Sequence, residues 1–173
     1  MSVLVKAAFP PIVDCNATIL ILGSMPGEQS LLAGQYYANK RNAFWVIMED
    51  LIGVSSELNY LQRIDKLKQA GIALWDVIEK CERAGSLDTA IVEETVIAND
   101  FTNFLQRYKK ITQIYFNGQS VQRLFAKHVL TKQTIRSDIQ MQVLPSTSPA
   151  NARYSVQQKL QYWRAQIDRN VID

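Results

Sequence analysis

The sequence predicts an α/β protein, a three-layer α/β/α sandwich around a central four-stranded parallel sheet. Four short runs of apolar and β-branched residues predict the strands, at residues 18–23, 72–78, 111–117 and 141–144. Each run is nearly continuous rather than alternating, which is typical of strands buried on both faces of a parallel sheet. The segments between them carry apolar residues at helical spacing, so strands and helices alternate along the chain.

Two helices are predicted between the first and second strands. The apolar stripe of the first consists of Phe44, Trp45, Met48, Leu51 and Ile52. The stripe of the second consists of Leu58, Leu61, Ile64 and Leu67. Gly71 follows in the position of a C-terminal cap, where a residue without Cβ readily takes the left-handed conformation that ends a helix.

Three more helices are predicted in the rest of the chain. The stripe of the first consists of Phe101, Phe104, Leu105 and Tyr108, and that of the next of Val121, Leu124, Phe125 and Val129. The last helix begins at a capping box, because Gln158 follows Ser155 by three residues. Its stripe consists of Val156, Leu160, Trp163 and Ile167.

Composition sets broad bounds on the protein. A length of 173 residues, of which 47% are hydrophobic, predicts one domain over residues 1–173 with a substantial core. No apolar run is long enough to span a membrane and the first residues lack a signal-peptide layout, so we expect a cytoplasmic protein. The net charge of +3 permits nucleic-acid binding without requiring it. Cys15 and Cys81 are too few for an iron–sulfur or structural zinc site, and we expect reduced thiols.

Several classes of chemistry lack their signatures in this chain. Neither a dinucleotide-binding fingerprint nor a Lys-Ser/Thr phosphate loop follows the first strand. His128, the only histidine, lies in a helical pattern beside Val129 and is expected to be an ordinary surface residue. No compact Asp/Glu cluster resembles a two-metal site. We therefore expect no metal and no cofactor, which leaves amides, hydroxyls, backbone dipoles and at most one carboxylate to do any chemistry.

Four loops follow the four predicted strands, so they should gather at one edge of the parallel sheet, where α/β proteins place their sites. They span residues 24–45, 76–88, 117–120 and 145–153. The first combines aromatic, amide and cationic side chains, which can stack on a base, bind its edge and hold a phosphate. The third meets a helix N-terminus, which favours anions. The fourth sets Ser and Thr between prolines, a rigid turn whose backbone can approach a phosphate.

Each loop also has a purely structural interpretation. Residues 23–27 form a tight turn in any case, and Tyr36 and Tyr37 are equally suited to the core. Phe44 and Trp45 fit the core of a helix better than a ligand contact, and Asn117 fits a helix cap. The occurrence of all four loops after successive strands is what favours a site.

The motifs resemble a known family. The sequences Gly-Ser-Met-Pro-Gly at 23–27, Tyr-Tyr-Ala-x-x-x-Asn-x-Phe-Trp at 36–45, Leu-Trp-Asp-Val-Ile-Glu-Lys-Cys-Glu-Arg-x-Gly-Ser-Leu-Asp at 74–88 and Pro-Ser-Thr-Ser-Pro-Ala at 145–150 resemble the DNA-deoxyinosine (hypoxanthine-DNA) glycosylases. These belong to the uracil-DNA glycosylase superfamily and are related to the mismatch-specific uracil-DNA glycosylases. The resemblance covers about residues 18–165 and implies the same four-stranded fold.

The resemblance also implies an activity and a partner. It implies a monofunctional DNA glycosylase of base excision repair, which flips a deaminated base and hydrolyses its N-glycosidic bond to leave an abasic site. Hypoxanthine from deoxyinosine is the expected base, in double-stranded DNA and also in single-stranded DNA, and the enzyme is expected to be a monomer. A uracil or mismatch-specific glycosylase stays open, since pocket shape decides between bases. A non-catalytic nucleic-acid-binding domain on the same fold also stays open, since no strong acid or base is evident.

Matching the motifs assigns roles to single residues. Asn42 falls on the Asn before Phe-Trp, which looks like the catalytic amide of the deoxyinosine branch. Relatives instead carry a catalytic Asn in the first motif, where this chain has Ser24 and Met25, so catalysis is expected downstream. Asn39 stands where many members have His-Pro and is a second candidate for positioning water. Tyr37 matches the aromatic that stacks on the flipped base.

The remaining expected contacts divide into two groups. The expected base contacts are Gly23, Ser24, Met25, Tyr37, Phe44, Asp76 and Asn117. The expected DNA contacts are Pro26, Gly27, Ser146, Thr147, Ser148, Pro149 and Arg153. The loop at 146–150 is expected to press the phosphates and to present a wedge to the gap left by the flipped base. Asp76 either positions water or only caps a turn, and Arg153, Lys40 and Arg41 either contact phosphates or lie solvated on the surface.

Overall fold

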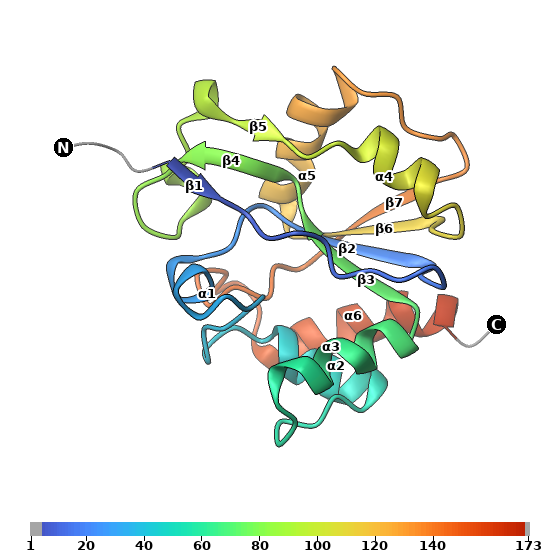
Figure 1. The fold of residues 1–173 in the computed structure, drawn as a ribbon. Helices are drawn as coiled ribbons and strands as arrows, with labels where there is room; N and C mark the ends of the chain where they lie inside the picture. The colour runs from blue at the N-terminus through green and yellow to red at the C-terminus, as the bar shows by residue number, and fades with distance from the viewer. Residues whose placement is uncertain (1–4, 172–173) are drawn as a thin grey trace.

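The computed structural model describes residues 5–171, with side chains to residue 167, and confirms the three-layer α/β/α sandwich (Figure 1). The four predicted strands form one parallel sheet in the order β3-β2-β6-β7. Their bounds are β2 Ile19–Gly23, β3 Ile72–Asp76, β6 Gln113–Asn117 and β7 Gln140–Leu144. Figure 1 shows α2, α3 and α6 on one side of this sheet and α4 and α5 on the other.

All predicted helices are present. They are α2 Phe44–Ile52, α3 Tyr60–Gln69, α4 Phe101–Arg107, α5 Gln119–Phe125 and α6 Val156–Val171. A short helix not predicted from the sequence, α1 Glu28–Ala33, lies inside the first loop. Short 3₁₀ turns span Asp88–Ala90 (η1) and Glu93–Thr95 (η2), and a π-helical turn spans Ala126–Leu130 (η3). Within the described residues, no helix combines the length and apolar character needed to cross a membrane.

The helix ends follow the signals in the sequence. The capping box of α6 forms as expected, with Ser155 N donating to Gln158 Oε1 at 2.9 Å and Gln158 N donating to Ser155 Oγ at 3.2 Å. Gly71 takes φ +71° just after α3 and donates its N–H to Lys68 O at 2.9 Å. Its left-handed conformation ends the helix and turns the chain directly into β3.

A second sheet, which the sequence did not predict, lies beside the first. It is antiparallel and runs in the order β1-β4-β5, with bounds β1 Val5–Ala7, β4 Ile78–Glu82 and β5 Ile97–Ala98. The expectation that residues 76–88 form one loop is therefore wrong. The burial pattern explains the error: Ile78 and Cys81 are buried with exposed residues between them, and a register shift interrupts the pairing with β5. A bulge of this kind breaks the alternation by which a strand is recognised.

The continuous apolar runs of β2, β3 and β6 are explained by burial on both faces of the parallel sheet. For β7 the expectation of burial on both faces is wrong, because this strand lies at the edge of the sheet and its first three residues are exposed. Leu20 and Leu22 face one side and pack in a cluster with residues of α4 and α5. Ile19 and Ile21 face the other side and pack with residues of α2 and α6. This alternation makes the carboxyl ends of the strands a rigid platform between two cores.

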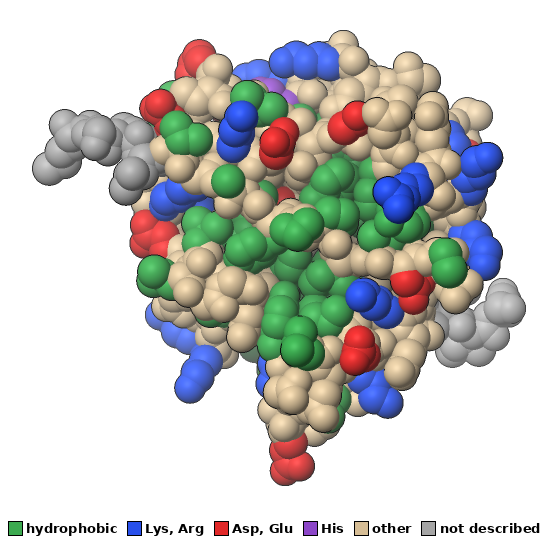
Figure 2. All heavy atoms as spheres, in the orientation of Figure 1, with side chains coloured by type: hydrophobic (Ala, Val, Ile, Leu, Met, Phe, Trp, Pro, Cys, Tyr) green, Lys and Arg blue, Asp and Glu red, His purple; other side chains and the backbone are tan. Residues whose placement is uncertain are grey.

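The open edge of β3 is covered by the segment that follows β1. Ile12 and Leu74 exchange backbone hydrogen bonds of 2.9 Å in an antiparallel bridge. In Figure 2, apolar side chains gather over the middle of the face on which β1 and the chain after it run in Figure 1. Covering an edge strand in this way removes a site for pairing with another chain.

His128 is buried, so the expectation of a surface histidine is wrong. It lies seven residues after Val121 and therefore on the apolar stripe of that helix. Burial lowers the pKa of His128, and the charges of Lys127 and Lys132 lower it further. The residue belongs to the core of the α5 side, away from the carboxyl edge of the sheet.

Trp163 gives a test of this packing. Its side chain is fully buried, and its indole N–H donates to Pro145 O at 2.9 Å. Trp163→Phe removes that donor and leaves a void, so the free energy of unfolding should fall by about 2 kcal/mol. Tyr162→Phe, on the half-exposed face of the same helix, should change it by less than about 0.5 kcal/mol. Urea unfolding measures both, and equal midpoints for the two variants would contradict the assignment.

Candidate active site

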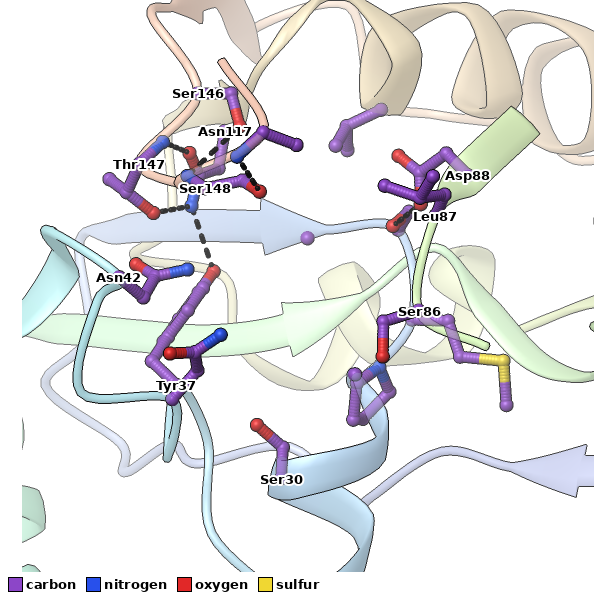
Figure 3. Close-up of a pocket in the computed structure, with 18 of the residues that line it drawn as sticks. Ser30, Tyr37, Asn42, Ser86, Leu87, Asp88, Asn117, Ser146, Thr147 and Ser148 are labelled. Atoms are coloured by element: carbon purple, nitrogen blue, oxygen red, sulfur yellow. Dashed lines mark hydrogen bonds between the residues drawn. The ribbon is translucent and has the colours of Figure 1, made fainter. Parts of the chain in front are cut away.

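The four loops meet around one cavity of about 580 Å³ at the carboxyl edge of the parallel sheet (Figure 3). Most of the residues expected at the site from the sequence line it. They are Gly23, Ser24, Met25, Pro26, Gly27, Tyr37, Asn39, Asn42, Asp76, Asn117, Ser146, Thr147, Ser148 and Pro149. Phe44 and Arg153 are not among the lining residues. The prediction that the loops after the four strands gather at one edge of the sheet is confirmed.

The floor of the cavity is formed where three strands end side by side. Gly23 pairs with Asp76 across β2 and β3, and Leu22 pairs with Phe116, so Asn117 stands level with Gly23 on the other side. A Cβ atom on Gly23 would lie 2.5 Å from Asp76 Oδ1 and 3.4 Å from Tyr37 Oη. Glycine is therefore required here because a carboxyl and a phenol approach the backbone together.

Tyr37 is held rigidly on the wall of the cavity. Its ring stacks on Phe44, with centroids 4.0 Å apart and planes 16° apart. Its hydroxyl accepts a hydrogen bond from Asn117 Nδ2 at 3.1 Å. With one face covered by Phe44, the ring can offer only its other face to the cavity. Phe44 itself is fully buried, so its expected contact with a base is wrong and its placement in the helix core is correct.

Asn117 connects Tyr37 to the loop at residues 145–150, the serine- and proline-rich loop. Its Nδ2 group donates to Thr147 Oγ1 at 2.9 Å as well as to Tyr37, and its Oδ1 accepts from Thr147 N at 2.8 Å. Both hydrogens of the amide are used, and Thr147 is fully buried. Figure 3 shows these contacts converging on Asn117. In the structure, Asn117 positions the ring and the loop.

Asn42 is oriented by the start of helix α2. Its Oδ1 accepts from Phe44 N at 2.9 Å, and the next residue, Ala43, donates its N–H to Thr147 O at 3.0 Å. The carboxamide is thereby fixed, and its NH2 group has no hydrogen-bond partner among the described residues. Asn39 Oδ1 accepts from Arg41 N at 2.9 Å. Both amides line the cavity, so the structure keeps both as candidates for positioning water.

Asp76 is the buried carboxyl of the cavity. It is 3% exposed, and its Oδ2 has no hydrogen-bond partner within the described part of the chain. Burial and, to a smaller extent, the neighbouring charge of Asp88 raise the pKa of Asp76 to about 7, against the opposing effect of Arg83. A carboxyl that is neutral near pH 7 can donate a hydrogen bond, which a carboxylate cannot.

Asp88 and Arg83 are parts of the site that the sequence analysis did not single out. Asp88 accepts hydrogen bonds from Ser24 Oγ at 2.6 Å and from Ser120 Oγ at 2.5 Å, so it joins three segments. Arg83 is fully buried and donates to the carbonyls of Met25 and Pro26. It follows the last residue of β4 and lies two residues after the buried Cys81, so it continues the inward face of that strand, a signal that required recognising β4.

Lys159 was also missed. It is 3% exposed, and its ammonium donates to Ser148 O at 2.9 Å, which ties the serine- and proline-rich loop to α6. Burial lowers the pKa of Lys159. The signal in the sequence was its position four residues before Trp163, on the inward stripe of the helix. Arg153 is exposed, and its guanidinium lies 5.4 Å from the ring centroid of Tyr154.

The close approach at Gly23 can be tested by measuring stability. In Gly23→Ala the new Cβ meets Asp76, so the free energy of unfolding should fall by about 1–3 kcal/mol. Gly27→Ala is the matched control, because its Cβ meets only Ser86 Oγ at 3.4 Å. Adding Asp76→Ala to Gly23→Ala should recover most of the loss, and a double-mutant cycle of urea midpoints measures that coupling. Additive effects would contradict the proposed contact.

Comparison with known proteins agrees with this geometry. The family model of the uracil DNA glycosylase superfamily matches residues 10–168. A hypoxanthine DNA glycosylase of Methanosarcina acetivorans is 35% identical over 154 residues, which is 88% of this chain and 92% of that protein. A hypoxanthine DNA glycosylase of Methanosarcina barkeri is 38% identical over 115 residues, which is 66% of this chain and 72% of that protein.

A solved structure shares the fold. It is a solution NMR structure from Methanosarcina acetivorans of a protein described as a candidate uracil DNA glycosylase. The two superpose with a TM-score of 0.78 at 33% sequence identity, over 96% of this chain and 98% of that one. On the family match, the sequence identity and the shared fold, the chain belongs to the uracil DNA glycosylase superfamily.

Proposed function

We propose that this protein is a monofunctional DNA glycosylase that excises hypoxanthine from deoxyinosine and leaves an abasic site. The observation that carries the proposal is the cavity wall, where one free aromatic face at Tyr37 stands beside the fixed amide of Asn42. Aromatic faces stack on bases, and amides bind their edges. Relatives at 35% and 38% identity bear the name hypoxanthine DNA glycosylase, which supports the same substrate here.

The reaction breaks the bond between the sugar and a base that leaves with negative charge. Hypoxanthine is a good leaving group because its keto group spreads that charge. We assign water positioning to the carbonyl of Asn42, which the Phe44 N–H holds in place, and contact with the base or sugar to its NH2 group. An amide is no strong base, so we expect slow turnover confined to activated bases.

Asp76 completes the site as a neutral acid. A carboxylate at the cavity floor would repel the charge that develops on the departing base. A protonated carboxyl instead donates a hydrogen bond to a keto oxygen of the base and stabilises that charge. Its free Oδ2 and its place next to Gly23 and the Tyr37 hydroxyl support this role.

Double-stranded DNA with a deaminated base is the proposed partner, and single-stranded DNA a further one. The loop at 146–150 lines the cavity with small polar residues, which suits phosphate contact, and we assign a flanking phosphate to the exposed Arg153, three residues further along the chain. A second cavity of about 340 Å³ shares Asp88, Thr89 and Ser120 with the first and is also lined by Arg123 and by the ion pair of Lys127 with Glu93. We propose that it extends the DNA path, and that the enzyme is a single-domain cytoplasmic monomer that needs no metal.

A panel of substrates tests this function. Duplexes and single strands with hypoxanthine, uracil or xanthine are incubated with the protein in EDTA and then treated with alkali, which cleaves abasic sites. Scission at hypoxanthine supports the proposal. Scission at uracil alone would favour the second candidate, a uracil glycosylase. The related NMR structure, which is described as a candidate uracil DNA glycosylase, supports this alternative. Scission at none of them, with DNA binding retained, would identify a non-catalytic binding domain.

Asn42→Ala should lower the single-turnover rate on hypoxanthine by roughly a hundredfold or more, because the amide that orients water and base is lost. The affinity of the variant for the same duplex should change little, and a mobility-shift titration measures it. Asn39→Ala is the matched control on the same loop, with a loss expected below about tenfold. A larger loss in Asn39→Ala than in Asn42→Ala would transfer the role of water positioning to Asn39.

Activity should depend on the protonation of Asp76. Its pKa is raised from 3.8 to about 7, so the carboxyl is neutral below that pH and the single-turnover rate should fall as pH rises through it. Asp76→Asn keeps a hydrogen-bond donor and should lose this pH dependence, whereas Asp76→Ala should be slow at every pH. An unchanged pH profile in Asp76→Asn would remove Asp76 from this role.

The same shift has a consequence for stability that needs no substrate. The pKa of Asp76 is higher in the folded state than in the unfolded state, so the folded state holds the proton more tightly. The contribution of Asp76 to the free energy of unfolding therefore falls as pH rises from about 4 to about 7. Asp76→Asn should lack this fall. The free energy of unfolding of the variant, measured in urea, should therefore increase relative to that of the wild type as pH rises. Parallel curves for the two proteins would show that Asp76 titrates normally.

A further inference from the structure

One large apolar side chain stands exposed at the cavity. Among the residues that line it, Leu87 is 57% exposed, whereas the lining residues Met25 and Val121 are buried. Figure 3 shows Leu87 beside Asp88, across the cavity from Asn42. A single exposed leucine is unremarkable on most surfaces. Leu87, however, lies at a cavity that we propose receives a flipped base, so its exposed side chain can contact the DNA around that base.

The backbone on both sides of Leu87 is anchored. Before it, Gly85 O accepts from Lys6 Nζ at 2.7 Å and Ser86 Oγ accepts from Glu28 N at 2.9 Å. After it, the Asp88 carboxylate holds hydroxyls from two other segments. A side chain on such a fixed support can enter a confined space with little further loss of backbone entropy.

The loop expected to supply a wedge is poorly suited to do so. At 146–150 it offers Ser146, Thr147, Ser148, Pro149 and Ala150, none of which is a long apolar side chain. Thr147 is fully buried, and Ser148 is tied to Lys159 through its carbonyl. This loop can lie against phosphates, but it has nothing to replace a base in the stack.

Extruding a nucleotide costs unstacking energy and leaves a gap that apolar side chains can fill. We infer that Leu87 inserts into the base stack at the gap left by the extruded deoxyinosine and keeps the nucleotide in the cavity. The inference rests on the proposed function. It assigns the inserted side chain to the segment after β4, which lies across the cavity from the serine- and proline-rich loop. The two segments would then contact the DNA from opposite sides.

The test compares substrates that differ only in the cost of extrusion. Leu87→Ala should lower kcat/KM roughly tenfold or more on a duplex with inosine paired to cytosine. The loss should shrink to within about twofold for inosine opposite an abasic site and for single-stranded DNA, where no base pair has to be broken. Leu87→Met keeps a long apolar side chain and should retain most of the activity on every substrate.

Controls separate this role from simpler ones. Leu61→Ala removes a leucine that is 73% exposed on α3, outside the cavity, and should match the wild type on all substrates. The fluorescence of 2-aminopurine next to inosine, which rises on unstacking, should increase on binding of the wild type and less with Leu87→Ala. Equal losses on all substrates, or none on the paired duplex, would overturn the inference. A wild type inactive on every inosine substrate would instead overturn the proposed function.

Discussion

The side-chain amide of Asn117 is the interaction on which the rest of the site depends. It binds the Tyr37 hydroxyl and the hydroxyl and N–H of Thr147, and the Thr147 carbonyl in turn accepts from Ala43 N beside Asn42. Segments that are 80 and 30 residues from Asn117 in sequence are thereby joined at the end of one strand. The ring of Tyr37, the amide of Asn42 and the serine- and proline-rich loop therefore form one preorganised unit, so under the proposed function a base would meet groups already in place.

Buried ionisable groups surround this unit, and each is used to fix a backbone or to serve the cavity. Arg83 supports the turn that carries Met25 and Pro26, and Lys159 supports Ser148 from the opposite wall. Burying a charge is unfavourable unless polar groups replace water, and backbone carbonyls do so for the Lys159 ammonium and for the two terminal nitrogens of Arg83. Asp76 has no such compensation at Oδ2, which is why it favours its neutral form. The same low-polarity surroundings that stabilise the neutral acid would also strengthen the hydrogen bond that we propose it donates to the base.

Local pattern was enough to predict the parallel sheet, its helices and the edge where the site lies, because strands buried on both faces leave continuous apolar runs. The cavity loops followed from the strand ends. What the sequence could not reveal depends on contacts between distant segments. The role of Asp88, for example, is seen only when the fold brings the hydroxyls of Ser24 and Ser120 to its carboxylate. His128 and Lys159 were different, since their positions on apolar stripes were visible and were passed over because of their polarity.

Tyr37 is the only residue other than glycine with a positive φ in the described part of the chain, at 55°. A side chain in that region strains the backbone by about 1 kcal/mol or more. Glycine would relieve the strain, but it would also remove the ring that packs on Phe44 and the hydroxyl that Asn117 binds. Burying an aromatic side chain is worth about 1.5–3 kcal/mol, which exceeds the strain. The surroundings of Tyr37 therefore hold the backbone in a conformation that it would not choose on its own, and the angle at which the ring enters the cavity is set by its neighbours rather than by its local sequence.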